Sequence, residues 1–243
     1  MNWVSLRDLG DDIRVWAESL PNDIDLVAGV PRSGMLPATL LALHRNIAVV
    51  DLPAFLSGCQ PRGGQRYRAR DVGKVLVVED SVCTGQSLEA YREPLRTLQE
   101  ELNIKVEIAT VYVAPGSEHR VDYWCRRLSL PRVFEWNLFH HSLLSACCMD
   151  IDGVLCRDPT DWENDDGERY ATFLSTVLPH IIPSQPVAHL VSNRLEQYRE
   201  QTADWLTTNG IQYGSLNLLD VSSGAERRRL AIHAHHKAEV YAR

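Results

Sequence analysis

The sequence has 243 residues, of which 44% are hydrophobic, so it is long enough to bury one large core or two smaller ones. That hydrophobic share is typical of a globular protein and argues against a disordered chain. Lys and Arg total 25 against 32 acidic residues, and the net charge of −7 is opposite in sign to that of most nucleic-acid binders. An anionic ligand would therefore have to be held by a local site and not by the overall charge.

The sequence also argues against a membrane or an oxidising compartment. No apolar run approaches the roughly 18 residues that a membrane span needs, and the N-terminal residues lack the pattern of a signal peptide. The six cysteines form no C-x-x-C pair, which argues against zinc and against a disulfide framework. We expect a cytoplasmic protein that binds neither membrane nor nucleic acid.

In the first half of the chain, short apolar runs alternate with helical patterns. Runs rich in Val and Ile, typical of strands buried on both faces of a parallel sheet, occupy residues 25–29, 47–52, 74–79 and 105–113. Leu88, Tyr91, Leu95, Leu98 and Leu102 recur at spacings of three and four, which predicts a helix beginning near Gln86. The pattern then becomes irregular over 114–141.

A second alternation follows this irregular stretch. It predicts strands at 143–149, 187–191 and 216–219, and helices at 194–208 and from about Ala225. Strands that alternate with helices in both halves indicate α/β architecture. The sequence therefore predicts two α/β domains, one at residues 1–140 and a smaller one at 141–243.

The most informative motif begins at the end of the predicted strand 74–79. Glu79 and Asp80 are followed by a loop, 81–85, that leads into the helix at Gln86. Loop amides at a helix N-terminus favour an anion, and ligands of parallel sheets bind at the carboxyl ends of strands. Two carboxylates would repel a phosphate but suit vicinal hydroxyls or a divalent cation beside it. The motif therefore predicts a site for a ribose 5-phosphate.

This run resembles the signature of type I phosphoribosyltransferases, which bind phosphoribosyl diphosphate (PRPP). The resemblance implies their fold, a parallel sheet flanked by helices. It also implies that the acids hold the ribose hydroxyls while the loop holds the 5′-phosphate. The residues so assigned are Glu79, Asp80, Ser81, Val82, Cys83, Thr84, Gly85, Gln86 and Ser87. An ordinary strand, loop and helix junction is the plainer alternative.

Two further segments fit the same resemblance. Family members grip the pyrophosphate with a loop after the first strand, which here implies Pro31, Arg32, Ser33 and Gly34. They also close a flexible loop over the diphosphate, and the basic stretch 60–74, with Arg62, Arg66 and Arg68, lies in that place. Taken alone, the first segment could be a plain turn and the second a solvated basic loop.

The resemblance implies a Mg²⁺-dependent enzyme that moves ribose 5-phosphate from PRPP to a nitrogenous base and releases pyrophosphate, with a homodimer as one compatible assembly. The base would lie under the irregular segment 114–141, whose aromatic residues could instead pack the domain junction. The sequence does not identify the base. The alternatives are a protein that senses PRPP or a nucleotide without catalysing transfer, and a nucleotide phosphatase that uses the second domain.

The second domain carries a partial resemblance to haloacid dehalogenase-like (HAD) phosphatases, which implies a smaller Rossmannoid α/β fold. Asp150 and Asp152 follow the predicted strand 143–149 and match the nucleophile and the general acid/base of that family, which also hold Mg²⁺. Ser192 and Lys237 match the phosphate-binding residues. Only six residues follow Lys237, too few for the strand and acidic pair of the fourth motif. Either the domain is truncated or its metal site is incomplete, and this argues against phosphatase activity.

Overall fold

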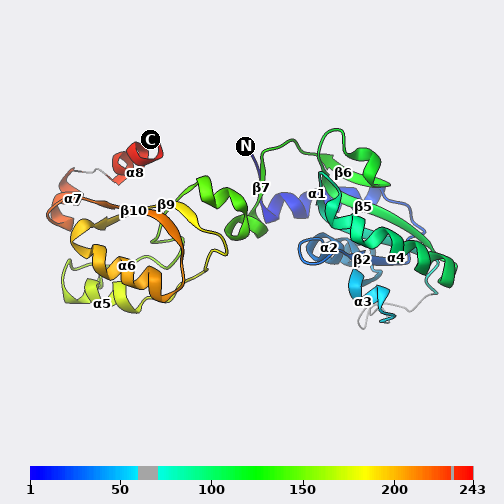
Figure 1. The fold of residues 1–243 in the computed structure, drawn as a ribbon, viewed down its shortest axis with the longest axis horizontal. Helices are drawn as coiled ribbons and strands as arrows, with labels where there is room; N and C mark the ends of the chain where they lie inside the picture. Colours follow the sequence, from blue (N-terminus) through cyan, green and yellow to red (C-terminus); the bar gives the residue numbers. More distant parts are fainter. Residues whose placement is uncertain (60–70, 231–232, 243) are drawn as a thin grey trace. The chain divides into compact units, whose positions relative to one another are not determined.

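The computed structural model describes residues 1–59, 71–230 and 233–242, and the chain forms two compact units, Met1–Asn137 and Leu138–Arg243 (Figure 1). Within the described residues, no helix is both long and apolar enough to cross a membrane.

A five-stranded parallel sheet forms the centre of the first unit, with the strand order β3-β2-β4-β5-β6. The strands are β2 (Leu26–Gly29), β3 (Ala48–Asp51), β4 (Lys74–Val82), β5 (Lys105–Val113) and β6 (Tyr123–Arg127). The helices are α1 (Leu6–Ser19), α2 (Met35–Arg45), α3 (Leu52–Leu56) and α4 (Gln86–Leu102), and the short helix η1 covers Glu118–Arg120. A separate parallel pair joins β1 (Asn2–Val4) to β7 (Arg132–Phe134).

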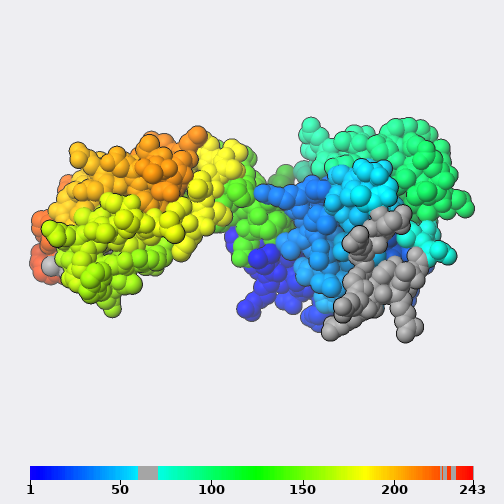
Figure 2. Space-filling view, turned by 90° about the horizontal axis from the view of Figure 1, so that it is seen from below, coloured from blue at the N-terminus to red at the C-terminus, as the bar shows by residue number. Residues whose placement is uncertain are grey.

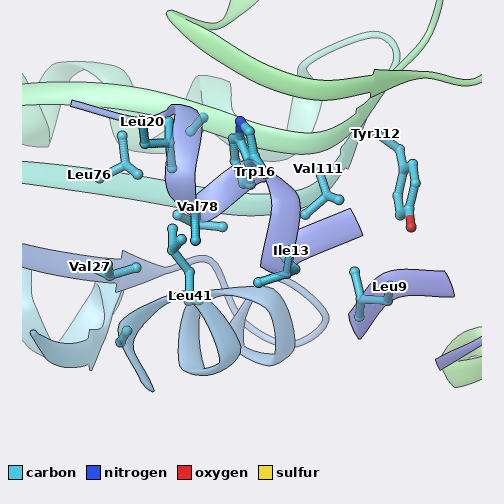
Figure 3. Packing of buried hydrophobic residues seen from close by; sticks show 14 of the residues in the cluster. Leu9, Ile13, Trp16, Leu20, Val27, Leu41, Leu76, Val78, Val111 and Tyr112 are labelled. Atoms are coloured by element: carbon cyan, nitrogen blue, oxygen red, sulfur yellow. The ribbon is translucent and has the colours of Figure 1, made fainter. Parts of the chain in front are cut away.

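Alternate residues of the central strands are buried on opposite faces of this sheet. On one face Val27 and Leu76 pack with side chains of α1 and α2, as Figure 3 shows. On the other face Leu26 and Val75 pack with side chains of α3 and α4. This arrangement explains why the strands appear in the sequence as continuous apolar runs, because both faces are covered by helices.

The strand order brings two loops together. From β2 the chain passes to β3 on one side, and it later returns as β4 on the other side. The loops after β2 and β4 therefore leave the sheet as neighbours at the point where the direction of winding reverses. Open α/β sheets bind ligands at such a position.

A three-stranded parallel sheet forms the core of the second unit, in the order β10-β9-β8. Its strands are β8 (Cys148–Met149), β9 (Val187–Leu195) and β10 (Tyr213–Leu219), and its helices are α5 (Glu168–Thr176), α6 (Arg199–Thr208), α7 (Gly224–Leu230) and α8 (His233–Tyr241). The remaining short helices are η2 (Glu135–His140), η3 (Ser142–Ala146) and η4 (Glu196–Tyr198). Helices α5 and α6 lie side by side (Figures 1 and 2), and α8 contacts β9.

The predicted bounds need four corrections. The strand expected at 74–79 continues to Val82, so the loop after it begins at Cys83. The segment 114–141 is less irregular than expected, since it contains β6 and β7. The strand expected at 143–149 is mostly the short helix η3, with only Cys148–Met149 extended. The helix expected from residue 194 begins at Arg199, because β9 continues to Leu195.

Candidate functional site

The two acids on β4 are buried at the carboxyl end of the sheet. Glu79 is 6% exposed and Asp80 is 5% exposed. Burial and the neighbouring Asp80 raise the pKa of Glu79 to about 8, although a hydrogen bond from Ser87 opposes the shift. Asp80 accepts a 2.8 Å hydrogen bond from the indole Nε1 of Trp136. Within the described residues, no lysine or arginine forms an ion pair with either acid, so the pair retains the capacity to bind a cation or hydroxyl donors.

A short loop separates these acids from α4. Gly85 has φ = 74°, a left-handed conformation that favours glycine, and its carbonyl accepts hydrogen bonds from the amides of Leu88 and Glu89. Gln86 and Ser87 are the first residues of α4, where backbone N–H groups lack partners within the helix. Cys83, Thr84 and Gly85 thus lead into a helix N-terminus that favours an anion.

Val82 departs from its predicted place in this loop. Its side chain is fully buried, and its carbonyl accepts the amide of Ala114. Ser81 is likewise still within β4 and is paired with Tyr112 of β5. The backbone that is open to a phosphate therefore begins at Cys83, two residues later than the sequence indicated.

The loop after β2 lies against the end of β4. The amide of Val30 donates to the carbonyl of Val78 at 2.9 Å. A Cβ atom at Gly34 would lie 2.6 Å from the Val30 carbonyl oxygen and 2.7 Å from that of Val78, so only glycine fits there. The peptide bond between Pro31 and Arg32 is cis. This contact places the residues assigned to the pyrophosphate beside those assigned to the ribose.

Asn137 joins this loop to the segment that follows β7. Its Oδ1 accepts a 2.7 Å hydrogen bond from Nη2 of Arg32, and its Nδ2 donates to Oγ of Ser33 at 2.9 Å. No pattern in the sequence pointed to Asn137, which lies more than 100 positions after the strand predicted at 25–29. An amide that binds both polar side chains of the loop fixes their orientation.

Aromatic residues form a wall next to the acids. Phe134 and Trp136 are stacked with ring centroids 4.8 Å apart, and Tyr112 lies 5.4 Å from Phe134. Of the aromatic residues in segment 114–141, Phe134 and Trp136 therefore adjoin the site. Trp124 is 39% exposed and belongs to β6, the edge strand of the sheet.

Two arginines near the site were not singled out from the sequence as functional residues. The side chain of Arg120 packs against Gly85, where an added Cβ would lie 3.2 Å from Cδ of Arg120, and its buried Nε has no hydrogen-bond partner. Arg132 on β7 is 7% exposed. Both come from segment 114–141, whose conformation the sequence did not predict. The arginines assigned to the flexible loop, Arg62, Arg66 and Arg68, lie outside the described residues.

In the second unit, each predicted acid is paired with a basic residue of the same unit. Asp150, directly after β8, forms an ion pair with Lys237 of α8. Asp152 accepts hydrogen bonds from Nε and Nη2 of Arg194, at distances between 2.7 and 3.2 Å. The side chain of Arg194 is fully buried, and Ser192 is 1% exposed. The structure thus pairs Asp150 with Lys237, which the resemblance assigned to a bound phosphate, and it gives Asp152 a partner that the sequence did not reveal.

The parallel sheet, the buried acids and the helix N-terminus beside them form an arrangement in which open α/β proteins bind ligands, at the carboxyl edge of the sheet. Comparison with known proteins gives the family. The model of the phosphoribosyl transferase domain matches residues 5–144, more than half of the chain. The chain belongs to this family.

Individual proteins are similar to part of the chain. A xanthine-guanine phosphoribosyltransferase of Chromohalobacter salexigens is 29% identical over 126 residues, which span 50% of this chain and 73% of the relative. A solved purine phosphoribosyltransferase from Pyrococcus horikoshii is 26% identical with a TM-score of 0.40, covering 56% of this chain and 95% of its own. A xanthine-guanine-hypoxanthine phosphoribosyltransferase from Helicobacter pylori is 18% identical with a TM-score of 0.40, covering 56% and 92%. The family match ends at residue 144, near the start of the second unit.

Proposed function

We propose that the chain is a phosphoribosyltransferase that moves ribose 5-phosphate from PRPP to a purine base and releases pyrophosphate. The observation that carries this proposal is the buried pair Glu79 and Asp80, which lies between the helix N-terminus at Gly85 and the loop at Arg32. The purine acceptor is supported by the relative at 29% identity, whose name specifies xanthine and guanine.

In this proposal the residues of the chain bind and orient the donor. Glu79 and Asp80 accept hydrogen bonds from the ribose hydroxyls, and the residues Cys83 to Ser87 bind the 5′-phosphate. Arg32 and Ser33 bind the diphosphate, which gains negative charge as the C1–O bond breaks. Positive charge develops on the ribose at the same time, as in glycoside transfer, so two carboxylates beneath the ring stabilise the transition state.

The residues at this site suit Mg²⁺. The ion prefers oxygen ligands and is often held by one or two carboxylates together with substrate phosphates. Glu79 and Asp80 supply such oxygens, and because burial and the neighbouring Asp80 raise the pKa of Glu79, a bound cation would favour its ionised form. Within the part of the chain that the structure describes, no cluster of three ligands could hold a metal by itself. When bound, Mg²⁺ would offset the charge on the leaving pyrophosphate.

For the second unit we propose a HAD-like domain without efficient phosphatase activity. The pairing of Lys237 with Asp150, at the end of a parallel strand, supports the resemblance. Asp152 would have to exchange a proton with the leaving group, yet both of its oxygens accept hydrogen bonds from a fully buried arginine. Release of a nitrophenol from p-nitrophenyl phosphate at a rate that Asp150→Asn abolishes would contradict this proposal.

The transferase is tested by incubating the full chain with PRPP, MgCl₂ and single bases, namely guanine, xanthine, hypoxanthine and adenine, and measuring pyrophosphate. We expect release with at least one purine. Asp80→Asn should weaken PRPP binding about tenfold or more, because a hydrogen bond to a charged group contributes about 1.5–3 kcal/mol. The matched control is Glu89→Gln, a carboxylate that is 71% exposed in the first turn of α4.

A protein that senses PRPP without transfer is the second candidate. It would bind PRPP in isothermal titration and still release no pyrophosphate above background with any of the bases. Unchanged PRPP affinity in both Asp80→Asn and Glu79→Gln would contradict the site assignment itself.

A further inference from the structure

One asparagine connects the two polar side chains of the loop after β2. Oδ1 of Asn137 accepts a 2.7 Å hydrogen bond from Nη2 of Arg32, and Nδ2 of Asn137 donates to Oγ of Ser33 at 2.9 Å. Asn137 follows Arg32 by 105 positions and belongs to the same unit as the loop. The side chains of this loop are therefore held by a residue from a distant part of the chain.

The backbone of the loop is fixed without Asn137, but its side chains are not. The carbonyls of Arg32 and Ser33 accept the amides of Met35 and Leu36 at 3.3 and 3.2 Å, where α2 begins. Within the described residues, the hydrogen bond to Asn137 is the one side-chain hydrogen bond of Arg32, which forms no ion pair there. A long side chain loses rotamer freedom when a ligand orders it, so an arginine that is already held binds more tightly.

The direction of these hydrogen bonds determines what the loop offers to a ligand. A hydroxyl has one hydrogen to donate and two lone pairs that accept. Because Nδ2 of Asn137 donates to Oγ of Ser33, the hydroxyl hydrogen has only the longer 3.3 Å contact to Oδ1 and can turn to a ligand. A guanidinium has five N–H donors, and Arg32 uses one of them on Asn137. Both side chains thus keep donors for an anion.

We propose that Asn137 is a positioning residue that holds Arg32 and Ser33 as hydrogen-bond donors to the diphosphate of PRPP. This inference rests on the proposed function, which assigns the diphosphate to that loop. An amide suits this role because it is neutral and carries both an acceptor and a donor. A carboxylate of the same shape would accept from both side chains, pair with the guanidinium and place a negative charge beside an anionic ligand.

Binding of the separate parts of the donor tests this without catalysis. Inorganic pyrophosphate and ribose 5-phosphate are titrated one at a time into the full chain at a fixed concentration of MgCl₂. Asn137→Asp should weaken pyrophosphate binding about tenfold or more, the loss of a hydrogen bond to a charged group, and leave ribose 5-phosphate affinity within about twofold. Asn137→Ala removes both bonds without adding charge and should weaken pyrophosphate binding about fivefold.

The matched control is Asn22→Asp. Oδ1 of Asn22 also accepts from an arginine, Nη2 of Arg45 at 3.2 Å, but Arg45 is the last residue of α2, at the end opposite to the loop. Neither affinity should change in this variant. A double-mutant cycle with Ser33→Ala tests the positioning itself, because Asn137→Ala should cost less pyrophosphate affinity once the hydroxyl that it orients is absent.

Three results overturn the inference. The first is pyrophosphate affinity that is undetectable in the unaltered chain or unchanged in Asn137→Asp. The second is an equal loss for ribose 5-phosphate, because Asn137 would then support the unit as a whole and not the loop. The third is a fully additive cycle with Ser33→Ala. The proposed transferase fails separately, if no base releases pyrophosphate from PRPP while the effect of Asn137→Asp on pyrophosphate binding stands.

Discussion

Each unit places two acidic residues at the carboxyl end of a parallel strand, but their electrostatic surroundings differ. In the first unit Glu79 and Asp80 are buried side by side, and Asp80 accepts a hydrogen bond from a neutral indole. In the second unit Asp150 pairs with Lys237, and Asp152 pairs with Arg194. At the same position in an α/β sheet, the first unit thus has an acid pair without basic partners among the described residues. In the second unit each acid is neutralised by a basic side chain.

This difference indicates which pair is built to bind a ligand. A carboxylate that is buried beside another carboxylate prefers to be protonated, unless a cation or hydroxyl donors approach it. The raised pKa of Glu79 reflects this preference for the protonated form. Asp152 already pairs with the buried Arg194, so its ionised form is stabilised without a ligand. The comparison therefore supports placing the proposed transfer chemistry in the first unit.

The largest effect is expected where the comparison is most direct, at Arg194. Arg194→Met leaves Asp152 without its partner, and removing one side of a buried ion pair costs about 3–5 kcal/mol. Urea unfolding of the full chain, with hydrogen exchange over Val187–Leu195 to follow the second unit, measures the loss. Arg199→Met is the control, because Arg199 and Glu196 are 43% and 40% exposed, and exposed pairs contribute about 1 kcal/mol or less. Equal losses in both variants would contradict a structural role for Arg194.

A second prediction concerns pH and the first unit. The pKa of Glu79 rises from its ordinary 4.5 to about 8 in the folded chain, so the folded state holds a proton that the unfolded state has released between these values. Its contribution to stability is fully present below 4.5 and is lost as pH rises through about 8. Glu79→Gln should remove this dependence.

The measurement is the free energy of unfolding of both proteins at several pH values across this window. The variant should become more stable relative to the wild-type protein as pH rises, by at most about 1.4 kcal/mol per pH unit. Because other titrating groups are the same in both, the difference isolates Glu79. A difference that does not change with pH would show that the acid pair is ionised and solvated in the folded chain.

The central elements of the first unit could be predicted because two signals in the sequence are strong, the apolar runs of buried strands and the apolar stripe of an amphipathic helix. Strands β2, β4 and β5 are continuous apolar runs, and α4 carries a regular apolar stripe, although its last member, Leu102, is 55% exposed. Strands β6 and β7 were missed because β6 lies at the sheet edge, with exposed arginines, and β7 has three residues and pairs with the distant β1. Short strands that depend on a partner far along the chain leave no periodic signal.

The site residues likewise fall into those that a local pattern predicts and those that depend on distant parts of the chain. The two loops follow strand ends and were predicted close to their places, as a local pattern allows, although Glu79 and Asp80 lie within β4 itself. Arg132, Asn137 and the bond from Trp136 to Asp80 depend on how segment 114–141 folds back over the sheet, which no local pattern encodes. In the second unit, residue 194 was assigned to a helix, so its buried pairing with Asp152 was not expected.

The smallest expected effect tests the hydrogen bond that the indole of Trp136 donates to Asp80. Trp136→Phe removes the indole N–H but keeps a ring that can stack on Phe134, whose centroid lies 4.8 Å away. Asp80 then loses the donor that orients its carboxylate, and PRPP affinity in isothermal titration should fall about fivefold, or about 1 kcal/mol. Trp124→Phe, on the exposed edge strand, should leave the affinity unchanged. If Trp136→Phe also leaves it unchanged, the indole only packs against the wall, and Asp80 is oriented by its burial and by the ligand alone.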